Sequence, residues 1–395
     1  MDREALDRSL VRRLIDHIDS GTTDFCDAVL EVPAEVYTSS DRLDRELEAL
    51  FHSRPLVLCL SGALPGPGSY KTVDLCGTPV LLTRDRDGTV HAFANACRHR
   101  GVRVADGCGE TRRFTCPFHA WVYDLEGTLV GLPTAPAFDG MCRDDKGLVP
   151  LPVAEGYGLV VGRLRPGPPI DIDEHLGPEL AEELALLDFA DWAPYGETHT
   201  HPVGANWKVT LDTYRENYHF DYLHRDTLKA YAYGGVLTFD ALGPHLRNCS
   251  ALRSIDELRE SPEDEWRDVD RYFSYQYSLF PNTCLTFDSR HIELWQIVPD
   301  GVDRSLVVHT AYARPGLSEE EQAKLVEMAP WICETVVDGE DFWVAARTVP
   351  GLGTGLVDTV VFGRNEPACQ HLHRGFQAAL DAAVDAGARA AADRP

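Results

Sequence analysis

The sequence predicts an α+β protein in which a small all-β domain is joined to a larger domain built from an antiparallel sheet covered by helices. Two observations support this prediction. Short β-rich segments separated by turn pairs fill residues 54–165, as in PVLLTR and TVHAFAN on either side of Asp87-Gly88. From residue 201 onward, strand-like segments such as HIELWQIV and SLVVHTAYA occur together with long helical segments.

The 395 residues fit about two domains with a helical N-terminal extension. In residues 1–53, leucines and an isoleucine recur every four positions from Leu6 to Ile18, and Ser39 begins a second such pattern. These helices are expected to pack on the larger domain. The Pro- and acid-rich segment RPGPPIDIDEH marks a junction, so the predicted division is 1–53, 54–165 and 166–395.

Two helices are predicted near the C-terminus. Ser318 and Glu321 have the spacing of a capping box at the start of a helix, which Pro330 is expected to interrupt. The Ala-rich residues 378–395 are expected to form a terminal helix that frays.

The charge of the chain excludes several classes of partner. The 37 Lys and Arg residues against 63 Asp and Glu residues give a formal net charge of −26. Such a chain is repelled by nucleic-acid backbones and by anionic membranes, so neither is an expected partner. No run of apolar residues suits a membrane span, and the charged start MDREALDRSLVRRL does not resemble an export signal. With eleven cysteines in no regular framework, a reducing, cytoplasmic setting is expected.

The first cluster of candidate ligands consists of Cys97, His99, Cys116 and His119, in the order C-x-H, sixteen residues, C-x-x-H. Both halves lie at strand ends beside residues that allow tight bends. Two thiolates and two imidazoles can bind zinc or an iron–sulfur cluster. Because each loop contributes one Cys and one His, the pattern favours a two-iron cluster with both sulfurs on one iron and both imidazoles on the other, the Rieske arrangement. A zinc-stapled β domain is the alternative.

Other Cys and His residues lack partners at matching spacing. The cysteines near the first cluster are predicted to be buried and structural: Cys59, Cys76, Cys108 and Cys142. Two His-x-His pairs have no third ligand near them in sequence and are predicted to be structural or on the surface: His199 with His201, and His371 with His373.

The second cluster lies in NWKVTLDTYRENYHFDYLH, residues 206–224. Asp212, Glu216 and His219 are spaced i, i+4, i+7, which places them on one face of a helix. His224 follows five residues after His219, so the helix must bulge or end for both imidazoles to converge. Two His ligands and one carboxylate, with coordination positions left open, are typical of non-haem Fe(II) oxygenases.

The carboxylate ligand is not fixed by the residues alone. Asp212 and Glu216 are local candidates, and the helix predicted over residues 336–343 offers Asp338, Glu340 and Asp341. An acidic helix face is also typical of a solvent-exposed surface, and two His residues are also typical of a protein core in which both are hydrogen-bonded.

These motifs together resemble the large (α) subunit of Rieske non-haem iron oxygenases, a family of aromatic-ring hydroxylating dioxygenases, mono-oxygenases and demethylases. The resemblance covers residues 50–350 and includes the lead-in Asn206-Trp207-Lys208 as well as both ligand clusters. It implies a Rieske domain followed by a helix-grip-like catalytic domain.

The resemblance assigns the ligands residue by residue. Cys97 and Cys116 are implied to hold one iron of a [2Fe-2S] cluster, and His99 and His119 the other. A mononuclear Fe(II) is implied to be held by three further residues: His219, His224 and Asp341. Asp341 is preferred because the family's third ligand follows an acidic residue at the start of a late helix, as Glu340-Asp341 does here.

Glu216 is implied to bridge the mononuclear iron site to a Rieske His of the neighbouring subunit in a head-to-tail homotrimer. Ring-hydroxylating dioxygenases usually have Asp at this place, and Glu resembles the branch that oxidises quaternary-ammonium substrates. Asp212 stands where naphthalene-type dioxygenases have Asn, and a role next to the iron ligands is predicted for it.

The implied function is that of a terminal oxygenase component, which uses O2 to hydroxylate or oxidatively dealkylate a small aromatic, cyclic or quaternary-ammonium substrate. No Gly-x-Gly-x-x-Gly strand–turn–helix unit is present, so NAD(P)H is expected to act only through a separate reductase, with or without a ferredoxin. The substrate pocket is expected to be lined from residues 220–300, whose aromatic residues are predicted mainly to pack in the core, with a cation-binding cage as the alternative. The alternative function is an electron-transfer or sensing protein without a working mononuclear iron.

Overall fold

The computed structural model describes residues 2–392, with side chains to residue 386. The chain forms two compact units. The mixed unit contains residues up to 50 together with 185–187 and the chain from 194 onward, and the β-rich unit contains 51–184 and 188–193. Residues 166–184, which the sequence analysis assigns to the C-terminal domain, thus group with the β-rich unit.

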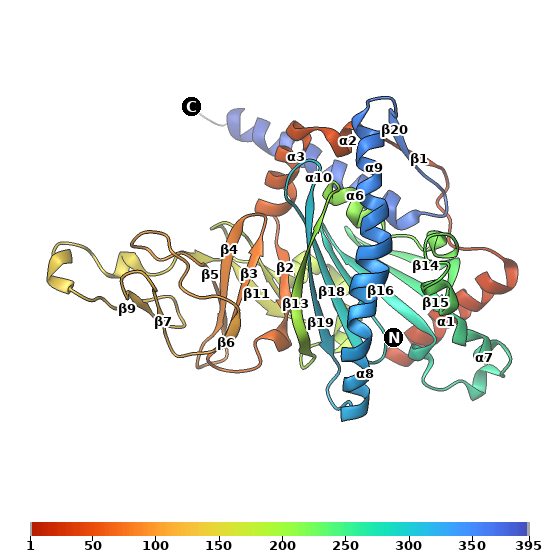
Figure 1. The fold of residues 1–395 in the computed structure, drawn as a ribbon, viewed down its shortest axis with the longest axis horizontal. Coiled ribbons are helices and arrows are strands. Elements are labelled where there is room, and N and C mark those ends of the chain that lie inside the picture. Colours follow the sequence, from red (N-terminus) through yellow and green to blue (C-terminus); the bar gives the residue numbers. More distant parts are fainter. Residues whose placement is uncertain (1, 393–395) are drawn as a thin grey trace. The chain divides into compact units, whose positions relative to one another are not determined.

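The mixed unit is built on a seven-stranded antiparallel sheet (Figure 1). Its strand order is β13-β19-β18-β17-β16-β15-β14, so six strands follow one another as a meander and the first strand in sequence pairs with the last. The alternation of apolar and polar residues in segments such as SLVVHTAYA favours this arrangement, since a strand presents alternate side chains to opposite faces. The strands are β13 (Ala193–Val203), β14 (Ala232–Leu242), β15 (His245–Leu252), β16 (Phe273–Leu279), β17 (Thr283–Phe287), β18 (His291–Pro299) and β19 (Ser305–Ala313).

A long helical run lies over this sheet (Figure 1). It consists of α8 (Glu319–Pro330), the π-helix η10 (Trp331–Phe342) and α9 (Trp343–Gly353). The predicted capping box is present, with the Ser318 side chain bonded to the backbone of Glu321 and the Glu321 carboxylate bonded to the backbone of Ser318. The predicted interruption at Pro330 is confirmed for the α-helix, which ends at this residue, although the chain continues in π-helical geometry as η10. The change to π-helical geometry directly after Pro330 accommodates its missing N–H group.

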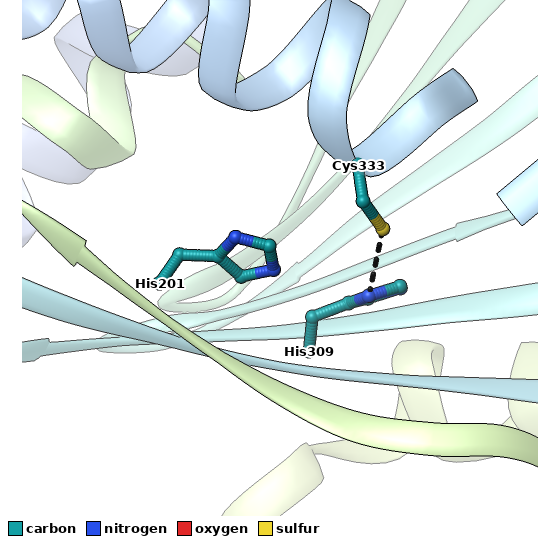
Figure 2. Close-up of side chains that lie close together, drawn as sticks. All are labelled: His201, His309 and Cys333. Carbon is teal, nitrogen blue, oxygen red and sulfur yellow. Dashed lines mark hydrogen bonds between the residues drawn. The ribbon is translucent and has the colours of Figure 1, made fainter. Parts of the chain in front are cut away.

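At one edge of the sheet, η10 passes over β13 and β19. Figure 2 shows that His201 on β13, His309 on β19 and Cys333 on η10 point toward one another there. Three elements that are far apart in sequence are therefore brought together at a single place.

The N-terminal residues belong to the mixed unit. Helix α1 (Arg3–Ser20) is capped by Asp2 and ends at Gly21, whose φ of 62° is the left-handed conformation that glycine tolerates. The Arg13 guanidinium of α1 donates to the Asp240 carboxylate of β14 at 2.8 Å. The following elements are β1 (Leu30–Pro33), which pairs with β20 (Thr359–Phe362), α2 (Glu35–Thr38), α3 (Ser40–Glu46) and the π-helix η1 (Leu47–His52).

Three small antiparallel sheets form the β-rich unit. The first has the order β10-β5-β4-β3-β6, the second β11-β12-β2 and the third β7-β8-β9. The hairpins predicted at Asp87-Gly88 and Glu126-Gly127 are confirmed. The strands are β2 (Leu56–Leu60), β3 (Ser69–Leu75), β4 (Thr78–Arg84), β5 (Val90–Ala94), β6 (Cys108–Glu110), β7 (Phe114–Thr115), β8 (Val122–Tyr123), β9 (Leu129–Gly131), β10 (Pro150–Leu151), β11 (Val153–Gly156) and β12 (Leu159–Gly162).

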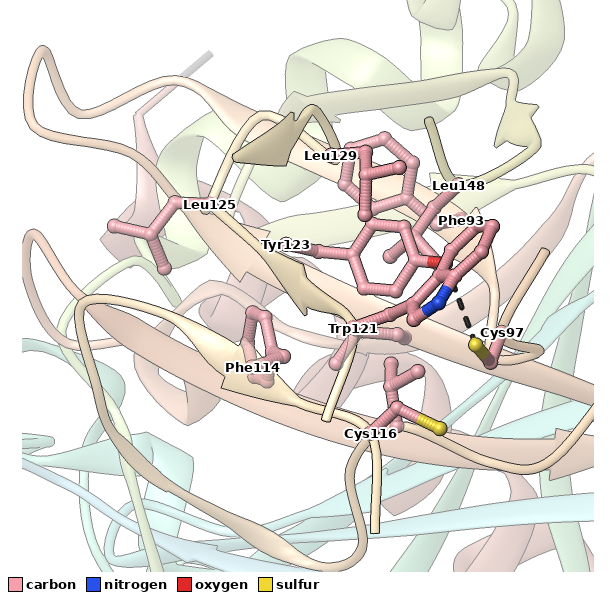
Figure 3. Close-up of a cluster of buried hydrophobic side chains, with 11 residues drawn as sticks. Phe93, Cys97, Phe114, Cys116, Trp121, Tyr123, Leu125, Leu129 and Leu148 are labelled. Carbon is pink, nitrogen blue, oxygen red and sulfur yellow. Dashed lines mark hydrogen bonds between the residues drawn. The ribbon is translucent and has the colours of Figure 1, made fainter. Parts of the chain in front are cut away.

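The core of the β-rich unit includes Cys97 and Cys116 (Figure 3). Their neighbours are aromatic and aliphatic side chains, among them Tyr123 on β8 and Trp121 just before it. Of the other cysteines of this unit, Cys59 is buried as predicted, but Cys108 and Cys142 are exposed, because they lie on a short strand and a loop with little chain around them.

The remaining elements are short or peripheral. The helices are α4 (Ile172–Leu176), α5 (Pro178–Leu187), α6 (Trp207–Asp212), α7 (Asp256–Arg259) and α10 (Pro367–Ala392). The predicted terminal helix is thus present to Ala392, and its last residues, 393–395, lie outside the described chain. Among the helices of the described chain, none is both long enough and apolar enough to span a lipid bilayer.

Candidate functional site

The two loops of the first cluster have the same backbone geometry. The N–H of Cys97 bonds to Val102 and that of Cys116 to Trp121, both at 2.8 Å. Each loop is closed by a second bond back to its cysteine, from Gly101 at 2.8 Å and Ala120 at 3.0 Å. Both of these residues have positive φ, 78° and 53°, which explains the glycine of the first loop. The repeated turn presents one Cys and one His from each loop.

The side chains of this cluster fit a two-iron centre. Both cysteines are 3% exposed, whereas the imidazoles of His99 and His119 lie nearer the surface with ring centroids 4.5 Å apart. The Nδ1 atoms of both rings are buried and have no hydrogen-bond partner, as expected of metal ligands. Two thiols and two imidazoles with free Nδ1 atoms form the donor set of a Rieske [2Fe-2S] cluster, with both sulfurs on one iron and both imidazoles on the other.

Tyr123 lies beside this cluster, although it is not among the residues predicted from the sequence. Its hydroxyl lies 3.4 Å from Cys97 Sγ and accepts the backbone N–H of Arg98 at 3.0 Å. Hydrogen bonds to the sulfurs are one of the means by which a protein sets a cluster's reduction potential. No spacing rule points to a tyrosine in a neighbouring strand, so only the three-dimensional structure identifies it.

The second cluster forms at the end of α6. This helix stops at Asp212, and a short 3-10 helix η5 (Tyr218–Asp221) follows. The prediction of one continuous helical face through Asp212, Glu216 and His219 is therefore wrong. The expectation that the helix bulges or ends so that both imidazoles converge is confirmed, although α6 already ends before His219. Glu216 caps η5 by accepting the backbone N–H groups of Tyr218 at 2.8 Å and His219 at 3.2 Å. This local capping competes successfully with continued α-helix.

Both imidazoles point their Nε2 atoms at Asp341 on η10. Asp341 Oδ1 lies 3.6 Å from His219 Nε2 and 3.2 Å from His224 Nε2. His224 is fully buried and Asp341 is 7% exposed. Two of the converging atoms, His224 Nε2 and Asp341 Oδ1, are buried without a hydrogen-bond partner. Donors about 3–3.5 Å apart suit one metal ion with nitrogen and oxygen ligands, so these residues fit a mononuclear iron.

Each imidazole is oriented by its own carboxylate. His219 Nδ1 contacts Glu216 Oε1, and His224 Nδ1 donates to Glu340 Oε2 at 2.7 Å. Since an ionised carboxylate only accepts, both rings carry their proton on Nδ1 and turn the lone pair of Nε2 toward the site. Thr227 also donates to Glu340, at 2.7 Å. Glu340, one of three acids that the sequence left unranked, thus orients His224.

The electrostatics of this group favour an added positive charge. Burial lowers the pKa of His219, but its contacts with the carboxylates of Asp341 and Glu216 outweigh burial and raise the pKa to about 9. Burial raises the pKa of Asp341, but the contacts with His219 and His224 bring it below its usual value. A cation bound among these three side chains would supply that charge in place of a proton.

A cavity of about 470 Å³ opens on these three residues. Its lining includes both apolar or aromatic and polar residues: Phe220, Leu228, Tyr231, Trp295, Trp331, Ile332, Val336 and Val337 among the first kind, and Gln276, Thr286, Asp288, Arg290, His291 and Glu293 among the second. The expected lining from residues 220–300 is only part of it, since α8 and η10 also contribute. Of the aromatic residues in that range, Tyr275, Tyr277 and Phe287 stack in the core at 4.7–5.9 Å, as expected.

Two other predicted residues lie away from this group. Asp212 accepts from the Tyr37 hydroxyl at 3.1 Å and contacts His373 Nε2 at 3.1 Å, so its predicted role next to the iron ligands stays a prediction. His201 is predicted to be structural or on the surface, with no third ligand near it in sequence. It is buried, and the fold brings it to His309 and Cys333, which are distant in sequence.

Comparison with known proteins gives matches in both units. Residues 54–151 match the family model of the Rieske [2Fe-2S] domain, and residues 189–382 match that of the ring hydroxylating alpha subunit (catalytic domain). The α subunit 2 of a terephthalate 1,2-dioxygenase terminal oxygenase component from Comamonas sp is 29% identical over 60% of this chain and 59% of that protein. The carnitine monooxygenase oxygenase subunit of Acinetobacter pittii is 31% identical over 50% of this chain and 54% of that protein. The matched part spans less than two thirds of either relative.

The fold also has close counterparts among solved structures. A quaternary ammonium Rieske monooxygenase in complex with L-carnitine superposes with a TM-score of 0.74 at 21% identity, covering 89% of this chain and 96% of that one. This similarity extends across both units, in agreement with the two family models. The chain therefore belongs to the family of Rieske non-haem iron oxygenase large (α) subunits.

Proposed function

We propose that this protein is the terminal oxygenase component of a multicomponent system, which uses O2 and electrons from a reductase to hydroxylate a small organic substrate. The observation that carries the proposal is the convergence of His219 Nε2, His224 Nε2 and Asp341 Oδ1 at a cavity of about 470 Å³. A purely structural metal site would have its ligands enclosed, whereas an oxygenase needs open positions beside its metal.

The residues of the two clusters have distinct tasks. We propose that Cys97, His99, Cys116 and His119 hold the [2Fe-2S] cluster and that His219, His224 and Asp341 hold the mononuclear iron. When bound, the cluster supplies single electrons and the mononuclear iron binds O2 beside the substrate. Glu216 and Glu340 keep each imidazole in the tautomer that binds metal, and the buried position of His224 and Asp341 limits the access of water.

The cavity indicates the class of substrate. Its apolar and aromatic lining residues suit a hydrocarbon portion, and Asp288, Arg290, His291 and Glu293 offer charged partners for a polar end. An aromatic acid or a quaternary-ammonium compound of small size combines these two features. Tyr231 and Trp331, whose rings pack edge to face at 6.0 Å, supply an aromatic surface on which a cationic group can rest.

Electron transfer between subunits is part of the proposal. Glu216 orients His219 and also lines a second cavity of about 400 Å³, through which we propose that a neighbouring chain's His119 approaches it. We propose a head-to-tail homotrimer in which Glu216 joins these two imidazoles. A separate NAD(P)H-dependent reductase, with or without a ferredoxin, would supply electrons in the cytoplasm.

Metal analysis of the iron-reconstituted protein tests the proposal. The expected content is about three irons and two acid-labile sulfides per chain, and Asp341→Ala should lower it to about two irons with the Rieske EPR signal unchanged. Asp338→Ala is the matched control, because Asp338 lies on the same helix but contacts His201. Two irons in the unaltered protein would instead support the electron-transfer alternative. Loss of the mononuclear iron from Asp338→Ala but not from Asp341→Ala would refute the ligand assignment.

A further inference from the structure

A second group of metal-ligating side chains lies in the mixed unit, outside the iron ligands proposed above. His201, His309 and Cys333 bring one donor atom each to within 4.8 Å of one another (Figure 2). They are 9%, 2% and 6% exposed.

Hydrogen bonds fix the tautomers of both imidazoles. His201 Nδ1 donates to Asp338 Oδ1 at 2.9 Å, and His309 Nε2 donates to Glu293 Oε2. Because an ionised carboxylate is only an acceptor, the lone pairs lie on His201 Nε2 and His309 Nδ1, the two atoms that face the cluster. A carboxylate behind each imidazole is the arrangement that orients metal-bound His residues in proteins.

The three donor atoms that face the centre of this cluster are not fully hydrogen-bonded. His201 Nε2 is buried and has no hydrogen-bond partner. Cys333 Sγ lies 3.4 Å from His309 Nδ1, so the thiol proton occupies the space between these two donors. A single ion that displaced this proton to solvent would pair all three donor atoms at once.

The group is not suited to nucleophilic chemistry. Burial raises the pKa of the Cys333 thiol to about 12, whereas a nucleophilic cysteine needs a lowered pKa. The cluster opens on a cavity of about 430 Å³, separate from the one next to Asp341, which leaves room for a fourth ligand such as water.

We propose that His201, His309 and Cys333 bind a zinc ion, with Asp338 and Glu293 as the carboxylates that orient the two imidazoles. Two imidazoles and one thiolate in approximately tetrahedral positions form a ligand set that zinc prefers. The ion would hold the substrate cavity in shape, because Trp295 stacks on His309 with ring centroids 3.8 Å apart and lines that cavity together with Glu293. This proposal does not depend on the oxygenase activity.

Zinc K-edge absorption spectroscopy tests the site in the full-length, iron-reconstituted protein after exposure to Zn²⁺ and desalting. The test uses a His219→Ala/Asp341→Ala background, in which zinc cannot occupy the proposed iron site. We expect about one zinc per chain with one sulfur at about 2.3 Å and nitrogens at about 2.0 Å. Cys333→Ala should remove this zinc, and Asp338→Asn should weaken its binding about 10–100-fold.

Cys249→Ala is the matched control, because Cys249 is a buried cysteine of the same sheet outside the cluster, and it should retain the zinc. His201→Ala provides a second test if Cys333→Ala does not fold, as judged by gel filtration and the Rieske EPR signal. The proposal is overturned if the background protein binds no zinc, if the bound zinc has no sulfur neighbour, or if zinc with a sulfur neighbour remains in Cys333→Ala or His201→Ala.

Discussion

Each imidazole of the proposed iron site is paired with a different carboxylate, and the two pairs have unequal surroundings. Glu216 is close to its own histidine in sequence and also accepts two backbone N–H groups. Glu340 reaches His224 from another element and receives a second bond from Thr227. The orientation of His224 therefore depends on the tertiary structure, whereas that of His219 is largely local.

Replacing Glu340 by Gln should weaken iron binding without affecting the cluster. The amide still accepts a hydrogen bond from His224 Nδ1, but it lacks the negative charge that increases the basicity of the ring. We expect the affinity for mononuclear iron to fall about 10–100-fold, measured by chelator competition, with an unchanged Rieske EPR signal. Glu327→Gln, an exposed acid on α8, should bind iron normally. Equal iron affinity in Glu340→Gln and the unaltered protein would contradict the orienting role.

Glu366 should make stability depend on pH. Burial is the main cause that raises its pKa to about 7, and the nearby charges of Glu216 and Asp212 add to it. Between about pH 4.5 and pH 7 the folded state then holds a proton that the unfolded state has lost, so the stability contributed by this group falls as pH rises through that window. The thermal midpoint of Glu366→Gln should exceed that of the unaltered protein at about pH 8 and match it at about pH 4. Equal midpoints at both pH values would exclude this effect.

Among individual residues, the sequence predicts those whose spacing along the chain forms a recognisable ligand motif. The four Rieske residues and the two iron-site histidines are of this kind. The adjacent acids Glu340 and Asp341 cannot be told apart by spacing, because neighbouring helical positions point in directions about 100° apart and the sequence does not say which direction faces the histidines. Tyr123, His309 and Cys333 come from separate strands and helices, so only the packing of those elements reveals them.

The helix α6 is anchored by a buried charge cluster. Glu46 is fully buried, and its carboxylate accepts from Lys208 Nζ at 2.6 Å and from the indole N–H of Trp207 at 3.0 Å. Arg42 donates to the other carboxylate oxygen at 2.8 Å. Since α6 leads directly into the residues that carry Glu216 and His219, this anchor fixes the start of the segment that forms the proposed iron site.

Glu46→Ala should therefore destabilise the mixed unit. It leaves Lys208 and Arg42 buried without their carboxylate, and loss of one partner of a buried pair costs about 3–5 kcal/mol. The expected result is a lower midpoint in urea denaturation followed by circular dichroism. Glu35→Ala, which removes an exposed acid from the neighbouring α2, should leave the midpoint unchanged. A similar midpoint for both variants would show that the anchor contributes little.

At the scale of elements, periodicity predicted the presence and type of most segments but not their ends. The i, i+4, i+7 pattern from Asp212 to His219 is a correct helical spacing, yet α6 ends at Asp212, and the carboxylate of Glu216 binds backbone N–H groups of the 3-10 helix that follows. At Pro330 the α-helix ends, yet the chain continues as a π-helix. Both outcomes depend on local hydrogen bonds that a hydrophobic pattern does not encode.

For the whole molecule, mixed trimers test whether electrons cross between chains. Cys97→Ala chains should lack the cluster, and Asp341→Ala chains should lack the mononuclear iron, so neither alone should reoxidise a reduced cluster rapidly with O2 in the presence of substrate. Co-expressed, the two variants should regain reoxidation, because a cluster on one chain can then reduce the iron site of the next. Stopped-flow absorbance of the cluster measures this. Absence of recovery in a confirmed mixed trimer would place the electron path within one chain.

The fold class follows from the sequence because each unit has its own strong pattern, namely short hairpins in one and long strands with helices in the other. The grouping of residues 166–184 with the β-rich unit could not be predicted from the sequence. A polar, proline-rich segment marks a domain junction, but it does not show to which of the two domains the adjacent residues belong.

The π-helix η10 carries Cys333 and Asp338 toward one group of histidines and Glu340 and Asp341 toward the other. An insertion or deletion of one residue between Cys333 and Glu340 would misalign one of these groups however the chain shifted to compensate. Directed evolution of this enzyme should therefore tolerate substitutions in this segment far better than any change in its length.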